Sequence, residues 1–301
     1  MSQKKTLPQA LAAPTGRQQG RSFRLSDLLH YVRRRLGATI LVALILIFIL
    51  TALIPGILAP YDPQKIDADV ALQAPAGAHW LGTDHLGRDI LSRLIHGTRV
   101  VMLVGLGGMG IAMSLGVLLG LLSGYYGGWT ESIIMRFTDA ILAFPTMLLA
   151  IIFVATFGAS AFNVVIVIGL GYLPRFTRLV RASVLVLKQT DFVLASRAIG
   201  ASDYRVLTRH ILPNAFVPII TQATLGIGFA FLIEAAMSYL GFGVQPPAPS
   251  WGAMLNKAQQ YLYVAPWFVL APGITISIAV LVFNLAGDRL RERADPRLRK
   301  L

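Results

Sequence analysis

The sequence predicts an all-α membrane protein with six transmembrane helices. Hydrophobic residues make up 55% of the 301 positions and charged residues only 14%. Charge is absent from whole windows of about 20 residues, the length that a helix needs to cross a bilayer. A net charge of +13 would indicate nucleic-acid binding in a soluble chain, but here the charges lie between apolar stretches, so no nucleic acid is expected as a partner. The absence of cysteine excludes disulfides, thiolate metal sites and cysteine nucleophiles.

The first 35 residues are polar and basic. We expect residues 1–35 to form a cytoplasmic tail whose last part, residues 26–35, is a short amphipathic helix at the membrane surface. A cleaved signal peptide is the competing interpretation, but the apolar run after Arg35 is too long and lacks a small-residue cleavage site. The first membrane span is expected at residues 36–58, which carry no charge.

A polar segment at residues 59–99 separates the first two spans. Its last part should become a helix near Arg88, with Thr83 or Asp84 as the cap. The second span, residues 100–124, carries glycines at four-residue spacing, which is typical of a smooth face for close helix packing. These glycines are Gly116, Gly120 and Gly124.

The remaining spans are expected at residues 133–154, 163–180, 215–239 and 262–285. Pro145 and Pro272 should kink the third and sixth spans. A proline-rich loop, GFGVQPPAPSWG, precedes the sixth span. The membrane domain therefore covers residues 36–287, and residues 288–301 form a cytoplasmic tail.

The positive charges set the orientation, because loops on the cytoplasmic side are enriched in lysine and arginine. With the N-terminus inside, 22 of the 27 lysines and arginines fall in inner segments and 5 in outer ones. Both ends and residues 182–214 are therefore expected in the cytoplasm, and residues 59–99 outside.

A polar, basic stretch at residues 190–214 interrupts the apolar pattern. It predicts two short helices joined at Gly200 and Ala201. Thr190 or Asp191 can cap the first helix and Ser202 the second, and Pro213 should end the second near Leu212. One edge of the second helix is apolar, while Arg205 and Arg209 share another, as in a helix that lies against a partner. The apolar edge holds Val206, Leu207, His210 and Ile211.

The sequence contains no phosphate-binding loop of the G-x-x-x-x-G-K-[ST] kind, so ATP and Mg²⁺ would have to be bound by another subunit. No base lies within sequence reach of Ser123 or Ser238, which argues against a hydrolase. The histidines of the outer segment invite a metal-site hypothesis with Asp84 and Asp89, but their spacing does not form one helical face, and no metal site is predicted. These histidines are His79, His85 and His96.

Ionisable residues inside the spans are candidates for function, because their burial is costly unless they are paired or hydrated. Glu234 could be a pathway or gate residue, or a hydrogen-bonded partner of a neighbouring helix. Asp139 is close enough to the cytoplasmic end to pair with Arg136.

The stretch at residues 190–214 resembles the cytoplasmic Glu-Ala-Ala loop of importer permeases of the ATP-binding-cassette (ABC) class. The family pattern is Glu-Ala-Ala, three residues, Gly, nine residues, Ile-x-Leu-Pro. Matching positions are Ala195, Gly200, Leu212 and Pro213, whereas Leu194, Ser196 and His210 depart from it. Three further segments, at residues 79–99, 241–255 and 283–297, resemble the second permease subunit of dipeptide, oligopeptide and nickel import systems.

The resemblance implies a type I ABC importer permease that pairs with a homologous second permease. Two cytoplasmic ATPase subunits would dock on the loops, and an extracytoplasmic binding protein would deliver substrate. The residues implied in ATPase coupling are Leu194, Ala195, Ser196, Arg197, Gly200, Ala201, Ser202, Asp203, Arg205, Arg209, Leu212 and Pro213. Contact with the binding protein would involve Asp84, Arg88, Asp89, Arg93, Gln245 and Trp251.

Two classes of function follow. An ATP-driven import permease, which is a transport subunit and not an enzyme, requires partner ATPases, whereas a secondary transporter works alone and usually shows an internal repeat. No repeat is found, so the first class is favoured. Di- or oligopeptides are the expected cargo, with nickel, a glutathione-like peptide or another small solute as alternatives. Leu194 in place of the family's glutamate raises a further question, whether the two ATPase docking sites are equal.

Overall fold

The computed structural model describes the backbone of residues 25–294 and the side chains of residues 36–292, so the outermost parts of the two predicted tails lie outside the described residues. The described residues divide into two units between Ile40 and Leu41, and residues 41–294 belong to one compact unit. The main helices are α1 (Leu25–Leu53), α2 (Pro55–Leu58), α3 (Ile90–Tyr126), α4 (Gly128–Leu142), α5 (Thr146–Phe157), α6 (Ala161–Leu187), α7 (Asp191–Ala198), α8 (Asp203–Arg205), the π-helical turn η2 (Val206–Ile211), α9 (Leu212–Tyr239), α10 (Trp251–Ala258) and α11 (Pro266–Ala294).

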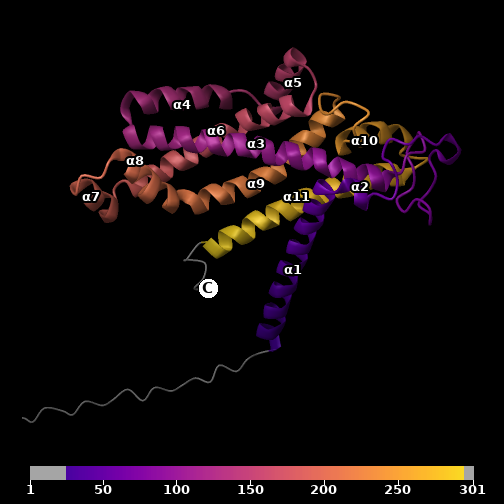
Figure 1. Ribbon diagram of the computed structural model, residues 1–301, viewed down its shortest axis with the longest axis horizontal. Helices are drawn as coiled ribbons and strands as arrows, with labels where there is room; N and C mark the ends of the chain where they lie inside the picture. The colour runs from indigo at the N-terminus through magenta and orange to yellow at the C-terminus, as the bar shows by residue number, and fades with distance from the viewer. Residues whose placement is uncertain (1–24, 295–301) are drawn as a thin grey trace, which may run out of the picture. The chain divides into compact units, whose positions relative to one another are not determined.

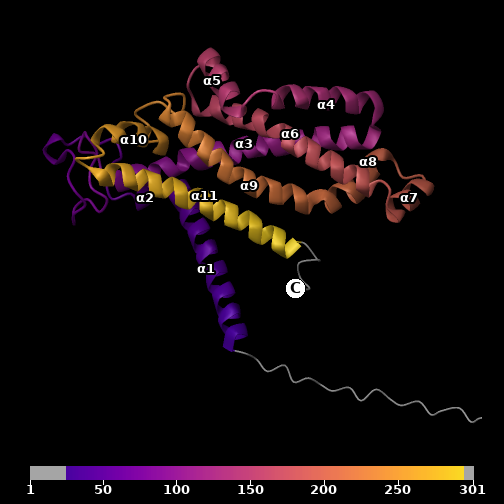
Figure 2. The same ribbon diagram turned by 180° about the vertical axis from the view of Figure 1, so that it is seen from behind.

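The described residues contain no strand, and the all-α prediction is confirmed. Five helical segments are long and apolar enough to cross a membrane, and α4 with α5 supplies a sixth crossing if the bent pair is one span. Within residues 41–294, α3, α6 and α9 run side by side. Figures 1 and 2 show α7 and α8 at one end of these helices, and α10 with residues 59–89 at the other.

The first helix differs from its prediction. Residues 26–35 are helical, but they continue without a break into the first span as α1. No proline lies between Leu25 and Ile54, so nothing separates a surface helix from the span. The helix ends at Leu53 because the following proline disfavours the helical conformation at Ile54, whose φ is −127°.

A row of glycines allows α3 to pack directly on α6. A Cβ atom on Gly116, Gly120 or Gly124 would lie only 2.5, 2.6 and 2.8 Å from the Cβ atoms of the facing side chains. Those side chains are Phe176, Val180 and Val184. The predicted close packing is therefore confirmed, and it lies within this chain.

The third predicted span, residues 133–154, is wrong as a single helix. It consists of α4 and α5, whose axes differ by 85°. Pro145 stands at the N-cap of α5 with an extended ψ of 127°, because its ring clashes with a continuing helix. Pro145 thus separates two helices of different direction, whereas the sequence predicted a kink within one helix.

Two acidic side chains of α4 reach across to arginines of α6. Arg178 donates to Asp139 over 2.6 Å, and Arg181 forms an ion pair with Glu131. The predicted pair between Asp139 and Arg136 is therefore wrong, because the neighbouring helix offers a better-placed guanidinium. These contacts hold α4 along α6.

Pro213 does not end the second short helix of the 190–214 stretch. The chain passes from α8 through the π-helical turn η2 into α9. In the wider turn, the Leu212 N–H donates to the Leu207 carbonyl, five residues earlier. Pro213 then falls in the first turn of α9, where its missing N–H needs no partner.

Replacing Gly120 with alanine should destabilise the α3–α6 pair by about 1–3 kcal/mol, because the added methyl group has no room. Gly110 on the same helix is exposed and has no atom within 4 Å of a built Cβ, so Gly110→Ala is the matched control. It should leave stability unchanged or raise it by less than about 1 kcal/mol. Thermal unfolding in detergent measures both changes, and equal midpoints would contradict the packing argument.

Candidate functional site

The 190–214 stretch holds the short helix α7 and a tight turn at Gly200 and Ala201, as predicted, but the helix that starts after Ser202 is not short and continues into α9. Thr190 and Ser202 stand at the two N-cap positions, although neither side chain accepts an N–H there. Gly200 has a φ of +83°, a left-handed conformation that favours glycine. The N–H groups of Gly200 and Ala201 donate to the carbonyls of Arg197 and Ser196, which closes the end of α7. The backbone conformation of the turn thus explains why a glycine stands at position 200.

Buried apolar side chains anchor this segment to the helices. Val193, Val206 and Ile211 are fully buried, and Ser196 is buried with them. The predicted apolar edge of the second helix is therefore confirmed at Val206 and Ile211.

The opposite side of the segment presents large apolar side chains to its surroundings. Leu194 is 50% exposed, Tyr204 77% and Ile199 87%. No atom lies within 4 Å of a Cβ built on Gly200, so the turn is open as well. Exposed apolar side chains beside exposed arginines, here Arg205 and Arg209, are typical of a surface that a protein partner covers.

A tyrosine at the end of α3 clamps both halves of the segment. The Tyr125 hydroxyl donates to Asp203 Oδ1 over 2.6 Å, and the guanidinium carbon of Arg197 lies 4.7 Å from the centre of the Tyr125 ring. Nearby, Lys188 Nζ donates to the Gly124 carbonyl over 3.0 Å. The sequence prediction missed Tyr125, because no local pattern links it to a residue 78 positions later.

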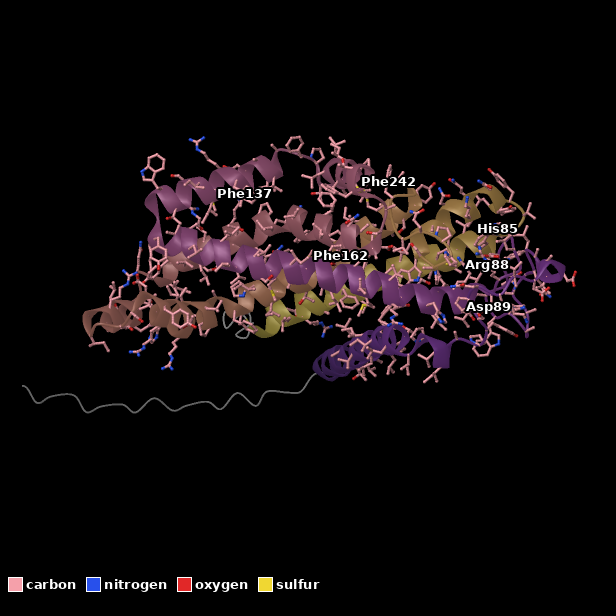
Figure 3. The ribbon with its side chains drawn as sticks, turned by 45° about the horizontal axis from the view of Figure 1, so that its top comes forward. His85, Arg88, Asp89, Phe137, Phe162 and Phe242 are labelled. Carbon is pink, nitrogen blue, oxygen red and sulfur yellow. The ribbon has the colours of Figure 1, made fainter. Side chains whose placement is uncertain are left out.

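The other end of the helices is built around Asp84, which is 1% exposed. Its carboxylate accepts the N–H groups of Leu86 and Arg88 and the Nε–H of Arg88 at 2.7 Å. Arg93 Nε lies 3.6 Å from the same carboxylate, and Arg93 Nη1 donates to the Pro63 carbonyl. Figure 3 shows Arg88 beside His85 and Asp89 at this end.

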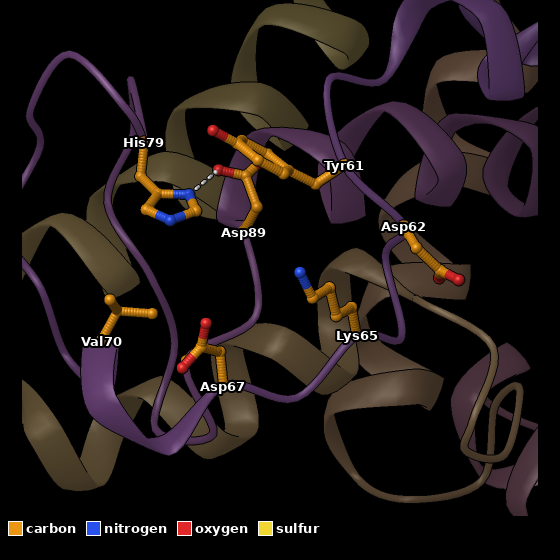
Figure 4. Close-up of a pocket in the computed structure, with 8 residues that line it drawn as sticks. Tyr61, Asp62, Lys65, Asp67, Val70, His79 and Asp89 are labelled. Carbon is orange, nitrogen blue, oxygen red and sulfur yellow. Dashed lines mark hydrogen bonds and ion pairs between the residues drawn. The ribbon is translucent and has the colours of Figure 1, made fainter.

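The cap of α3 is Asp89, so the prediction of Thr83 or Asp84 is wrong. Asp89 accepts the N–H and the hydroxyl of Ser92 at 2.8 and 2.7 Å. The Asp84 carboxylate instead accepts hydrogen bonds from Leu86 and Arg88 in the turn before the helix. His79 Nδ1 lies 2.9 Å from Asp89 Oδ1, next to a cavity of about 60 Å³ (Figure 4).

Four of the six residues expected to contact a binding protein are buried. Asp84, Asp89, Arg93 and Trp251 are between 1% and 7% exposed. Trp251 Nε1 donates to the Leu94 carbonyl, which fixes α10 to α3. These four are therefore internal supports of the loops, and a direct contact is left to Gln245, which is exposed, and to Arg88, which is half-buried.

The histidines of this end have separate roles. His85 stacks on the rings of Tyr261 and Phe268, and His96 Nδ1 bonds to the Ser92 carbonyl. Among the side chains that the structure describes, those of residues 36–292, no three histidine or acidic side chains come together as metal ligands do.

Glu234 is fully buried in α9. Its Oε1 accepts hydrogen bonds from Ser238 over 2.7 Å and from Ser250 over 3.3 Å. Ser250 is the N-cap residue of α10, so the carboxyl group joins α9 to α10. This geometry supports the structural alternative for Glu234 over the gate.

The helices and the exposed loop define a transport subunit of the type I ABC importer class. Residues 116–300 match the family model described as "Binding-protein-dependent transport system inner membrane component". The chain belongs to this family. It is a multi-pass permease of the inner membrane that acts with a binding protein and ATPase subunits, and it is not itself an enzyme.

Curated relatives agree with this assignment. The chain is 44% identical over 256 residues, 85% of each chain, to the glutathione transport system permease protein GsiD of Pectobacterium atrosepticum. It is 44% identical over 261 residues, 86% of each chain, to the dipeptide transport system permease protein DppC of Alkalihalophilus pseudofirmus. It is 44% identical over 260 residues, 84% of this chain and 86% of the relative, to the di/tripeptide transport system permease protein DppC of Pseudomonas aeruginosa.

A solved structure shares the fold. The inward-facing MetNI methionine ABC transporter matches with a TM-score of 0.53 and 19% identity, over 68% of this chain and 96% of that one. At this identity the likeness shows the fold alone.

Replacing Tyr125 with phenylalanine should loosen the 190–214 segment while keeping the ring packing. The lost hydrogen bond to a carboxylate is worth about 1.5–3 kcal/mol, so amide hydrogen exchange at residues 191–205 should speed up. Tyr126 is its exposed neighbour, and Tyr126→Phe is the matched control. Unchanged exchange in Tyr125→Phe would show that the clamp does not hold the segment.

Proposed function

We propose that this chain is one of two homologous permease subunits of an ATP-driven importer of short peptides. Curated relatives that share 44% of its residues are named for dipeptide, di/tripeptide and glutathione transport, and this carries the proposed substrate class. A glutathione-like peptide is the second candidate, because GsiD relatives match as well as DppC relatives do.

The proposed orientation places residues 190–214 in the cytoplasm and residues 59–89 outside. The distribution of lysine and arginine supports it, since 22 of 27 fall on the side of the 190–214 stretch. The two segments also lie at opposite ends of the helices (Figure 1).

The proposed coupling surface is the exposed side of the 190–214 segment. Its apolar members are Phe192, Leu194, Ile199 and Tyr204, and its charged members are Arg197, Asp203, Arg205 and Arg209. The small residues Ala195 and Gly200 allow the partner ATPase to approach this surface closely. ATP and Mg²⁺ bind to the partner ATPases, and this chain supplies no ligand to them.

The proposed mechanism is alternating access. Closure of the ATPase dimer pushes the 190–214 segment of each permease, and the permeases change between inward-open and outward-open arrangements. Leu194 replaces the glutamate of the family pattern, so this loop contributes apolar contact where a carboxylate would otherwise sit. The two docking sites of the heterodimer are then unequal if the companion permease keeps its own glutamate.

Replacing Gly200 with leucine should abolish ATP-driven uptake while the helices stay assembled, because the side chain strains a left-handed turn and projects into the coupling surface. Gly158 also has a positive φ, +93°, with no atom within 4 Å of a built Cβ, and lies between α5 and α6. Gly158→Leu therefore also strains a glycine of positive φ, away from the coupling surface, and should retain uptake. Uptake in proteoliposomes at wild-type level in Gly200→Leu would refute the coupling assignment.

The substrate class is tested on the cognate binding protein of this permease. Calorimetry with a dipeptide, a tripeptide, glutathione and Ni²⁺ should show binding of at least one peptide at micromolar concentration or below. Binding of Ni²⁺ without any peptide would overturn the peptide assignment and leave the importer assignment intact.

A further inference from the structure

A cavity of about 400 Å³ opens at the end of the molecule that holds residues 59–89. The turn at residues 84–88, the loop at residues 241–248 and α10 form its walls. Its volume lies in the range of about 300–1,000 Å³ that small-ligand sites occupy. Figure 3 shows His85 and Arg88, two of its lining residues, at this end.

The cavity has an excess of positive charge. Its lining contains Arg88, Arg93 and Lys257 but only one acid, Asp84. The Asp84 carboxylate accepts three hydrogen bonds, one from the Leu86 N–H and two from Arg88, and it also lies beside the Arg93 guanidinium. Its charge is therefore already matched within the chain.

Within the described residues, three polar groups that line the cavity lack a hydrogen-bond partner, namely the Lys257 ammonium, Arg93 Nε and His85 Nδ1. Lys257 is exposed and forms no hydrogen bond or ion pair within the part of the chain that the structure describes. Arg93 is 7% exposed, and its Nε makes no hydrogen bond there either. The lining therefore presents unused hydrogen-bond donors together with its positive charge.

His85 does not supply charge to the cavity. Burial against aromatic rings lowers the pKa of His85, and the neighbouring cations lower it further, against the opposing effect of Asp84. The positive charge is thus carried by the two arginines and Lys257.

The remaining wall is partly apolar, with the polar side chains of Ser238, Gln245 and Asn256 beside it. Val244, Met254 and Phe268 contribute its apolar side chains. A partly apolar wall beneath a cationic rim fits a carboxylate on a short carbon chain better than a compact, fully hydrated anion. Aspartate and glutamate side chains have this form.

We propose that this cavity receives an aspartate or glutamate side chain of the extracytoplasmic binding protein, with Lys257 as its counter-ion. The proposal rests on the proposed function, which places the binding protein at this end of the helices. Asp84 holds the half-buried Arg88 in place before the partner arrives, so its guanidinium needs no further ordering, while Arg93 adds positive charge from behind it. Lys257 at the exposed rim attracts the incoming carboxylate.

Carbodiimide cross-linking tests the contact directly. The reagent joins a lysine amine to a carboxylate that touches it, with no spacer. In the complete transporter in nanodiscs with its binding protein, this chain should form a cross-link whose peptide contains Lys257 and an acidic residue of the binding protein. Lys257→Arg keeps the charge but cannot form the amide, so the cross-link should disappear.

Affinity is the second readout. In Lys257→Gln, the binding-protein concentration for half-maximal ATPase stimulation should rise about tenfold, with the largest effect at low salt, while the maximal rate stays unchanged. Lys257→Arg should restore the wild-type value. Lys65→Gln removes another exposed lysine of the same end, outside the cavity, and should change the value less than about twofold.

The outcomes separate the possibilities. Wild-type affinity in Lys257→Gln, or a cross-link from Lys257 to the companion permease, would overturn the proposal while leaving the importer assignment intact. A raised KM for peptide uptake, lost when the peptide carries a C-terminal amide and with no change in binding-protein affinity, would assign the cavity to the substrate and also overturn it. Absence of any stimulation in the wild-type and Lys65→Gln complexes would refute the proposed function itself, and this proposal with it.

Discussion

The contact between α3 and α6 is the constraint on which the rest of the structure depends. Glycines at three successive turns of α3 let the two helices approach until side chains of α6 touch the α3 backbone. In a bilayer, where lipid is as apolar as leucine, such close packing is the main source of attraction between helices. It also fixes the position of Tyr125, one residue beyond the last of these glycines, under the 190–214 segment.

Parallel packing of α3 and α6 requires the chain to return between them, and α4 and α5 make that return. Successive contacts pair Gly116, Gly120 and Gly124 with residues that also increase along α6, so the helices run in the same direction. The turn at Pro145 and the ion pairs from α4 to Arg178 and Arg181 are the local means by which the return path is held.

The long apolar helices and the docking segment could be predicted from the sequence, because hydropathy and turn residues are local signals. The glycine spacing of α3 was informative for the same reason. The prediction of the α3 cap failed because Asp84 and Asp89 are both suitable N-cap residues. In the structure Asp84 binds Arg88 in the preceding turn, and Asp89 is left to cap the helix. Prediction also failed at Pro213, where a wider helical turn accommodates a residue that usually ends a helix. Contacts between residues far apart in the sequence, such as Arg178 with Asp139 or Asp203 with Tyr125, cannot be predicted from local sequence patterns.

The continuity of α8, η2 and α9 has a mechanical consequence. Residues Asp203–Tyr239 form a single run of 37 helical residues. At 1.5 Å per residue the run is about 55 Å long. It acts as a lever arm: tilting it by about 5° at the Asp203 end displaces the far end by about 5 Å over that length. The far end carries Glu234, whose hydrogen bond to Ser250 passes the displacement on to α10. A tilt at one end of the run is thereby amplified at the other, less what the π-helical turn η2 and Pro218 take up by bending.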